Sequence, residues 1–249
     1  MDDLLELTSR VEADHFWFRG FRAFITPLLD EAAAGRPDLR LLDCGCGTGH
    51  NLALLSRYGD VVGFDLTPGG LELAKRSAVP LVRAEMSRMP FRSGSFDILT
   101  SFDVLQYVDD DGLALREVAR LLRPGGTAVL TASALEVLRG GHAGAWPEVR
   151  RYTKARLRRI AIDAGLHIER LTYLFGSLLP MMLAVRAARR NSPADCQGED
   201  WEMSIPPAPI NNALTWLLRT EAALTRRMPF TPAGSSVLIV ARKAAPAPF

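Results

Sequence analysis

The chain has 249 residues and a mass of 27.3 kDa, which suits one large domain and leaves little room for two complete ones. Hydrophobic residues make up 48% and charged residues 23%, so disorder, collagen and coiled coil are excluded as descriptions of the whole chain. With 30 basic and 28 acidic side chains the net charge is +2, which is too small to indicate a nucleic-acid partner by itself.

The cysteines and the apolar stretches indicate in which cellular compartment the protein is expected. Cys44, Cys46 and Cys196 are too few for a disulfide framework, and the C-x-C spacing of the first two is tighter than a C-x-x-C metal knuckle. The N-terminus is acidic, unlike the basic start of a signal peptide. The longest apolar stretch, 178–185, is interrupted by Pro180 and is far shorter than the ~20 residues that span a bilayer. We therefore expect no metal site and a reducing, cytoplasmic environment.

The predicted elements alternate between strand and helix from residue 39 onward, after a helical segment at 1–37. Strands are predicted at 39–43, 60–65, 80–84, 96–101, 127–131, 166–174 and 235–242, and helices at 51–58, 68–78, 113–122, 153–164, 176–190 and 210–227. Proline and paired glycine at 123–126 predict a turn. This alternation indicates parallel strands joined by crossover helices. The segment 175–233 separates the last two strands, so we expect an insertion or lid there.

The clearest motif is the glycine loop at 43–49, Asp-Cys-Gly-Cys-Gly-Thr-Gly, which follows the first predicted strand and opens a predicted helix. Glycines in such a loop let the backbone turn sharply and let a ligand lie against it. His50 occupies the place of the third glycine of the dinucleotide fingerprint, and no Gly-Lys-Ser/Thr follows, which excludes a P-loop.

Asp65 ends the second predicted strand, 22 residues after Asp43. A carboxylate at this place can accept hydrogen bonds from both hydroxyls of an unphosphorylated ribose, whereas it would repel a 2′-phosphate. The pair of features predicts a nucleoside ligand with a free ribose and no diphosphate. The alternative is a glycine turn that serves only helix–strand packing, with Asp65 solvated at a strand end.

Five segments together resemble the class I S-adenosylmethionine-dependent methyltransferases, and they span about residues 39–131. They are residues 43–49, 64–65, 85–91, 95–99 and 121–126. The resemblance implies an α/β, Rossmann-like seven-stranded fold, with a mostly parallel sheet, an antiparallel last strand and helices on both faces. We expect one domain, 1–249, divided into an N-terminal helical lid (1–37), a cofactor-binding core (38–174), a helical insertion or cap (175–233) and the last strand and tail (234–249).

A second, narrower resemblance is to a bacterial subgroup of small-molecule methyltransferases that begins with E-x-x-H-[FW]-W-F-R-G. It is carried by residues 12–20, and Arg151-Tyr152-Thr153 and Pro229-Phe230 are similar to the same subgroup.

The resemblance implies S-adenosyl-L-methionine as cofactor and S-adenosyl-L-homocysteine as product. Asp65 would hold the ribose hydroxyls, Glu85 would face the adenine amino group, and Met86 would offer its backbone N–H to the ring. Arg19 could pair with the cofactor carboxylate. The complete predicted set of cofactor-binding residues is Asp43, Gly45, Cys46, Gly47, Gly49, Asp65, Leu66, Glu85, Met86, Phe102, Asp103 and Arg19.

Methyl transfer from a sulfonium requires chiefly alignment and exclusion of water, and a base only when the nucleophile is a neutral hydroxyl. The candidate catalytic residues are His142, Tyr107 and His15. Tyr107 and Tyr152 could form a hydrogen bond with a substrate hydroxyl. The alternatives are an exposed loop histidine for His142, core packing for Tyr107 and Tyr152, and helix packing beside aromatics for His15. Related sequences often have Glu-His where this chain has Gln106-Tyr107, so no histidine is inherited there.

We expect methyl transfer to oxygen of a small molecule, such as a sugar, a lipid-linked compound or a secondary metabolite. Alternatives are N- or C-methylation, an RNA target, or a cofactor-binding protein without methyl transfer; the near-neutral charge and the lack of an added RNA-binding module argue against nucleic acid. Basic residues crowded between 150 and 159 predict an anionic acceptor or a solvated helix face. The apolar helices of the insertion would cap the cleft, contact a membrane surface or an amphiphilic substrate, or form a dimer face, so monomer and homodimer are both open.

Overall fold

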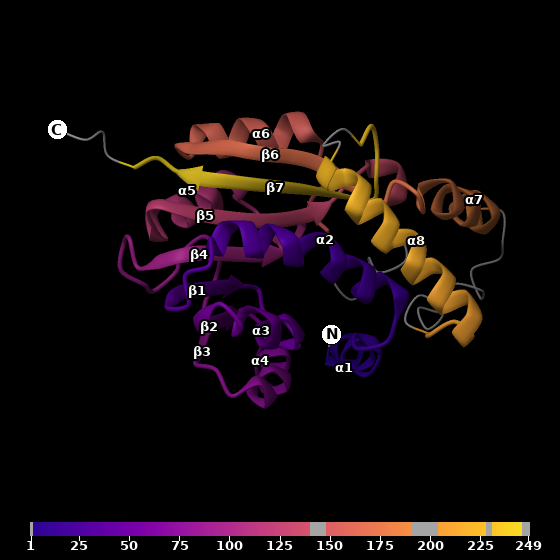
Figure 1. Cartoon of the computed structure of the whole chain (residues 1–249), viewed down its shortest axis with the longest axis horizontal. Helices are drawn as coiled ribbons and strands as arrows, with labels where there is room; N and C mark the ends of the chain where they lie inside the picture. The colour runs from indigo at the N-terminus through magenta and orange to yellow at the C-terminus, as the bar shows by residue number, and fades with distance from the viewer. Residues whose placement is uncertain (1, 140–147, 191–203, 228–230, 246–249) are drawn as a thin grey trace.

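The alternation of strands and helices produces one mixed sheet. The computed structural model describes residues 2–139, 148–190, 204–227 and 231–245, and within them seven strands form the order β3-β2-β1-β4-β5-β7-β6. β7 is antiparallel to both β5 and β6, whereas β1 to β5 are parallel, so the predicted sheet is confirmed (Figure 1). The strands are β1 (Leu39–Cys44), β2 (Gly59–Asp65), β3 (Leu81–Arg83), β4 (Phe96–Phe102), β5 (Leu122–Ser133), β6 (Leu166–Leu174) and β7 (Ser236–Lys243).

Helices cover both faces of this sheet. They are α1 (Asp2–Val11), α2 (Phe16–Ala33), α3 (His50–Leu55), α4 (Pro68–Ala74), α5 (Asp111–Leu121), α6 (Lys154–Asp163), α7 (Leu179–Arg190) and α8 (Ala208–Arg227), with short 3-10 turns η1 (Lys75–Ser77), η2 (Leu105–Tyr107) and η3 (Glu136–Leu138). In Figure 1, α2 and α8 lie in front of the strands. Among these described helices, none is both long and apolar enough to cross a bilayer.

Two hydrophobic cores lie on opposite faces of the sheet, because consecutive residues of a strand point to opposite sides. One core contains buried side chains of α2, α3 and α8, and the other contains those of α5 and α6. The central strands alternate between them, with Leu41, Ile98 and Val129 in the first core and Leu42, Leu99 and Leu130 in the second. These strands are therefore buried on both faces, which explains their continuous apolar runs.

Two predictions differ from the structure in the kind or number of elements, beyond shifts of a few residues at element ends. The turn predicted at 123–126 lies inside β5: Leu122 pairs with Phe96 and the ladder resumes at Thr127, so the residues between them form a bulge. The helical segment predicted at 1–37 is two helices. Their break is stabilised by Arg22, whose guanidinium donates to the backbone carbonyls of Glu12 and Ala13 at 2.9 and 3.1 Å.

α8 is held against the start of α2 by close packing and by an amide clamp. A Cβ on Gly20 would lie 2.3 Å from Leu218 Cδ1, so only glycine permits this approach. The buried Asn211 side chain accepts from the backbone N–H of Phe16 at 2.8 Å and donates to the carbonyl of Asp14 at 2.9 Å. Residues almost two hundred positions apart thus fix the N-terminal segment in place.

Candidate functional site

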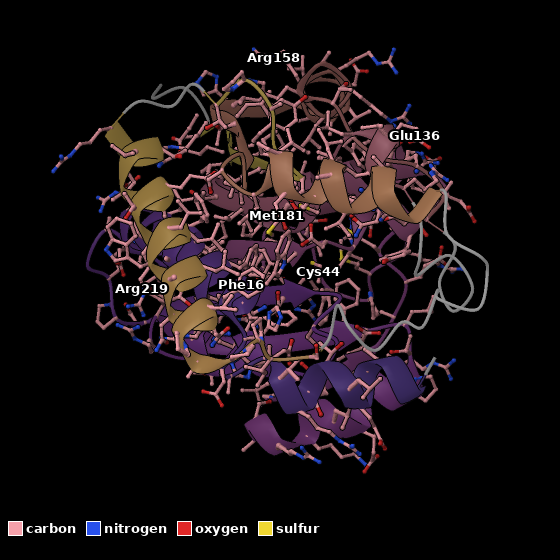
Figure 2. The ribbon with its side chains drawn as sticks, turned by 90° about the vertical axis from the view of Figure 1, so that its right-hand side faces the viewer. Phe16, Cys44, Glu136, Arg158, Met181 and Arg219 are labelled. Atoms are coloured by element: carbon pink, nitrogen blue, oxygen red, sulfur yellow. The ribbon has the colours of Figure 1, made fainter. Side chains whose placement is uncertain are left out.

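A cavity of about 1190 Å³ lies where β1, β2 and β4 end at their carboxyl side, the edge at which parallel α/β sheets bind ligands. Figure 2 looks at this end of the molecule, with α7 above, α8 at the left and α1 below. Phe16 and Met181 lie in the space between these helices, and both line the cavity.

The glycine loop forms the floor of one part of the cavity. Gly45 and Gly47 line it with φ angles of 74° and 49°, a backbone region that favours glycine. The N–H groups of Gly45 and Cys46 both donate to the carbonyl of Phe64, at 2.8 and 2.9 Å, which joins the loop to the end of β2. A Cβ on Gly47 would meet nothing within 4 Å, so the space above this residue is open to a ligand.

Asp65 is buried at the carboxyl end of β2 and lines the same part of the cavity. Its Oδ2 accepts from the N–H of Gly47 at 2.8 Å, and its Oδ1 accepts from the N–H and hydroxyl of Thr67 at 2.8 and 2.7 Å. The carboxylate is therefore not merely solvated at a strand end. It braces the glycine loop, and Oδ2 keeps more acceptor capacity than Oδ1.

Five more of the predicted cofactor-binding residues also gather here. Cys46, Leu66, Glu85, Met86 and Phe102 all line the cavity. Met86 is 3% exposed, whereas Leu66 is 52% exposed at the rim.

Three of the predicted cofactor contacts lie outside the cavity lining. Asp43 is buried behind the loop, where Thr100 donates to its Oδ1 at 2.7 Å and burial raises the pKa of its carboxyl to about 7. Gly49 caps the N-terminus of α3. Arg19 donates to Asn212 Oδ1 at 3.2 Å, so its guanidinium joins α2 to α8. The structure supports structural roles for these three residues.

Asp103 follows β4 in a strained conformation at the cavity wall. Its φ is 55°, an uncommon value for a residue other than glycine, and its N–H donates to the carbonyl of Thr131 at 3.1 Å. Its Oδ1 is buried and has no hydrogen-bond partner within the described part of the chain. Burial raises the pKa of this carboxyl to about 6. Tyr107 lines the same wall, and burial raises the pKa of its hydroxyl to about 12.

His15 lines the cavity but also caps α2. Its Nδ1 accepts from the N–H of Trp17 at 3.2 Å, its ring contacts Phe16 with centroids 4.5 Å apart, and it makes a hydrogen bond with the backbone of Ser204. Burial lowers the pKa of the imidazole, which favours the neutral ring. Both ring nitrogens are engaged, so packing and capping explain this residue better than base catalysis. His142 lies outside the described residues.

The contact between Glu12 and Thr48 was not predicted from the sequence. The hydroxyl of Thr48, in the glycine loop, donates to Glu12 Oε2, and both residues line the cavity. Burial raises the pKa of the Glu12 carboxyl. Glu12 does belong to the N-terminal E-x-x-H motif, which marks it as a candidate. The local sequence, however, does not indicate that its partner lies 36 positions away.

The basic cluster at 150–159 does not gather at the cavity. Arg156 forms an ion pair with Asp111 at 2.9 Å, and Tyr152 is fully buried with its hydroxyl donating to the same carboxylate at 2.9 Å. A substrate contact for Tyr152 is therefore wrong. Arg151 does line the cavity, but it pairs with Glu148 at 2.6 Å.

No group of three or more possible metal ligands occurs in the ranges that the structure describes.

Comparison with known proteins agrees with this geometry. Residues 42–130 match the methyltransferase domain family. The chain is 37% identical over 100 residues to a malonyl-[acyl-carrier protein] O-methyltransferase of Legionella pneumophila, which covers 37% of this chain and 35% of that relative. The chain thus spans about a third of the length of this curated relative.

Solved structures share the fold at low sequence identity. Phosphoethanolamine N-methyltransferase 2 of Haemonchus contortus, in complex with S-adenosyl-L-methionine, aligns with a TM-score of 0.62 and 17% identity over 98% of this chain and 57% of that one. The [4+2]-cyclase SpnF aligns with a TM-score of 0.58 and 20% identity over 90% of this chain and 81% of that one. Residues 42–130 therefore resemble the methyltransferase domain family, and the described part of the chain has the seven-stranded, Rossmann-like fold of the methyltransferases.

Proposed function

We propose that this protein is an enzyme that transfers a methyl group from S-adenosylmethionine to a small-molecule acceptor. The observation that carries the proposal is the pairing of an open glycine loop with a buried acid on the neighbouring strand. Gly47 leaves unfilled space above it, and Asp65 lies beside that space. The match of residues 42–130 to the methyltransferase domain supports the same cofactor.

The residues present fit this cofactor. Gly45 and Gly47 would lie against its methionine and ribose, and Asp65 Oδ2 would accept from a ribose hydroxyl. Glu85 and the backbone of Met86 would face the adenine. The cofactor, when bound, supplies a methyl group already activated by the positive charge on sulfur.

The task of the chain is then to align the acceptor and exclude water. We assign the segment 1–37 to a lid and 175–233 to a cap over this cavity, because α1, α2, α7 and α8 contribute to its wall. When the methyl acceptor is a hydroxyl group, a base must take up the proton of that hydroxyl. Asp103, with a raised pKa of about 6, would be ionised at neutral pH and suits this role better than His15, whose nitrogens are engaged.

A second candidate is a protein that binds the cofactor and catalyses another reaction. The structure of the [4+2]-cyclase SpnF shares this fold, and a fold does not by itself determine chemistry. Gln106, where related sequences often have glutamate, donates its amide to the carbonyl of Asp103 at 2.7 Å and so has a structural task. Detection of a methylated product separates the two candidates.

Calorimetry with S-adenosylhomocysteine tests the shared premise. Wild-type protein should bind it, and Asp65→Asn should weaken binding by about 10-fold or more, since a hydrogen bond to a charged group contributes ~1.5–3 kcal/mol. Because Asp65 also braces the loop, adenosine and 2′,3′-dideoxyadenosine are compared on the wild type. Equal affinity for these two nucleosides would contradict the ribose role, and no binding of S-adenosylhomocysteine would reject the proposal.

A further inference from the structure

The cavity has two chemically different parts. Its volume of about 1190 Å³ exceeds the ~300–1000 Å³ of pockets that hold one drug-sized ligand, so there is room for a second molecule beside a nucleoside. The part beside β1 and β2 is lined by the glycine loop, Asp65, Thr67 and Glu85. The other part, which we call the apolar compartment, is lined by Phe16, Trp17, Val137, Leu138, Leu178, Met181, Met182, Val185 and Leu214.

The wall of the apolar compartment is fixed on one side and adaptable on the other. On the α2 side, Trp17 stacks on Phe175 with ring centroids 4.0 Å apart. On the other side, Met181 of α7, labelled in Figure 2, is 44% exposed. Val137 of η3 is 50% exposed, and both residues line the cavity. Methionine is flexible and polarisable, and large apolar side chains exposed together at a cavity indicate a ligand surface.

The charges around the cavity disfavour an anionic occupant. Among the residues that the structure describes, six acids line it, Glu12, Asp65, Glu85, Asp103, Asp109 and Glu148, against three arginines, Arg139, Arg151 and Arg186. Arg151 pairs with Glu148 at 2.6 Å, and Arg139 pairs with Glu136 at 2.5 Å. Counted over both parts of the cavity, a carboxylate or phosphate would meet more acidic than basic side chains, whereas a cationic sulfonium is favoured.

We propose that the apolar compartment binds the methyl acceptor, and that this acceptor is an uncharged molecule with a hydrocarbon ring or chain and a reactive hydroxyl. The inference depends on the proposed function, because the part of the cavity beside β1 and β2 is assigned to the nucleoside cofactor. The hydrocarbon would contact α7 and η3, and the hydroxyl would face Asp103 and Tyr107. This class differs from the anionic acceptor that the basic cluster at 150–159 predicted.

The test uses 4-alkylphenols with chains of two to eight carbons as probes, titrated by calorimetry into protein saturated with S-adenosylhomocysteine. Affinity should rise about fourfold for each methylene that enters the compartment. The matching 4-alkylbenzoates, ionised at neutral pH, should bind at least about tenfold more weakly than the phenols. Affinities independent of chain length, or benzoates that bind as well as phenols, would overturn the proposal.

A matched pair of variants on α7 locates the binding. Met181 lines the cavity, whereas Leu183, 38% exposed on the same helix, does not. Met181→Glu should weaken 4-hexylphenol binding about tenfold or more and leave the affinity for S-adenosylhomocysteine unchanged, and Leu183→Glu should change neither. Equal effects of the two substitutions would contradict the site. If the wild type binds S-adenosylhomocysteine but no phenol, only this inference fails; if it binds neither, the proposed function fails first.

Discussion

Gly20→Ala is expected to destabilise the protein, although alanine is the better helix former. The added Cβ would lie 2.3 Å from Leu218 Cδ1 and 2.7 Å from Leu218 Cβ. The second atom is attached directly to the backbone of α8, so rotation of the leucine side chain cannot relieve the overlap and the helices must separate. Overpacking of this kind lowers the free energy of unfolding by ~1–3 kcal/mol, whereas the better helix propensity of alanine raises it by about 1 kcal/mol. Because the overlap with Leu218 Cβ cannot be relieved by rotation, we take the upper part of that range, about 2–3 kcal/mol, which leaves a net loss of about 1–2 kcal/mol.

The assay is urea unfolding followed by circular dichroism, with thermal unfolding in parallel. The loss should lower the Tm by about 2–8 °C, at ~2–4 °C per kcal/mol for a chain of this size. Gly112→Ala on α5 is the control, because its Cβ would meet nothing closer than 3.4 Å, and it should be neutral or slightly stabilising.

A double-mutant cycle identifies the contact. Leu218→Ala alone should cost ~2–5 kcal/mol because it empties a buried site, and in that background Gly20→Ala should become neutral or stabilising. A Gly20→Ala protein that is more stable than wild type would refute the close approach of α2 and α8.

Two further substitutions test the site. His15→Ala removes the acceptor at the N-terminus of α2 and should lower the free energy of unfolding by about 1 kcal/mol or more, while His15→Asn should retain most of it, as measured by urea unfolding; equal losses would show that capping is unimportant. Asp103→Asn should change the pH dependence of stability. Folding raises the pKa of Asp103 from 3.8 to about 6, so the stability this carboxyl contributes is complete below about pH 4 and is lost as the pH rises through 6. Relative to the wild type, the free energy of unfolding of the variant should therefore rise by up to about 3 kcal/mol between about pH 3 and pH 7, at ~1.36 kcal/mol per pKa unit, and a constant difference across this range would contradict a buried carboxylate whose charged form is disfavoured.

Much of the fold follows from local patterns in the sequence. Apolar periodicity predicts the strands, and Thr153 marks the start of α6, where its hydroxyl accepts from the N–H of Arg156 at 3.2 Å. The glycine loop and Asp65 are likewise predictable, because the carboxyl ends of neighbouring parallel strands meet at one edge of a sheet.

Partners of charged side chains could not be predicted in the same way. The sequence shows that Arg151 and Arg156 lie in a basic cluster, but only the packing of α6 against α5 shows that Asp111 neutralises the second of them. Arg19 lies in the N-terminal motif at residues 12–20, yet its partner, Asn212, is supplied by a helix near the other end of the chain. Such pairings depend on which elements pack together in the tertiary structure, and local periodicity does not predict this.

The amide of Asn211 and the contact between Gly20 and Leu218 have a consequence for biosynthesis. The first helices leave the ribosome long before the segment that holds them, so they must wait through most of translation without their native neighbours. The aromatic residues that begin α2 are exposed during that interval. The part of the cavity wall that is synthesised first can therefore reach its native packing only after α8 has been synthesised. A nascent chain arrested before residue 208 would be expected to leave this amino-terminal part accessible to proteases and chaperones.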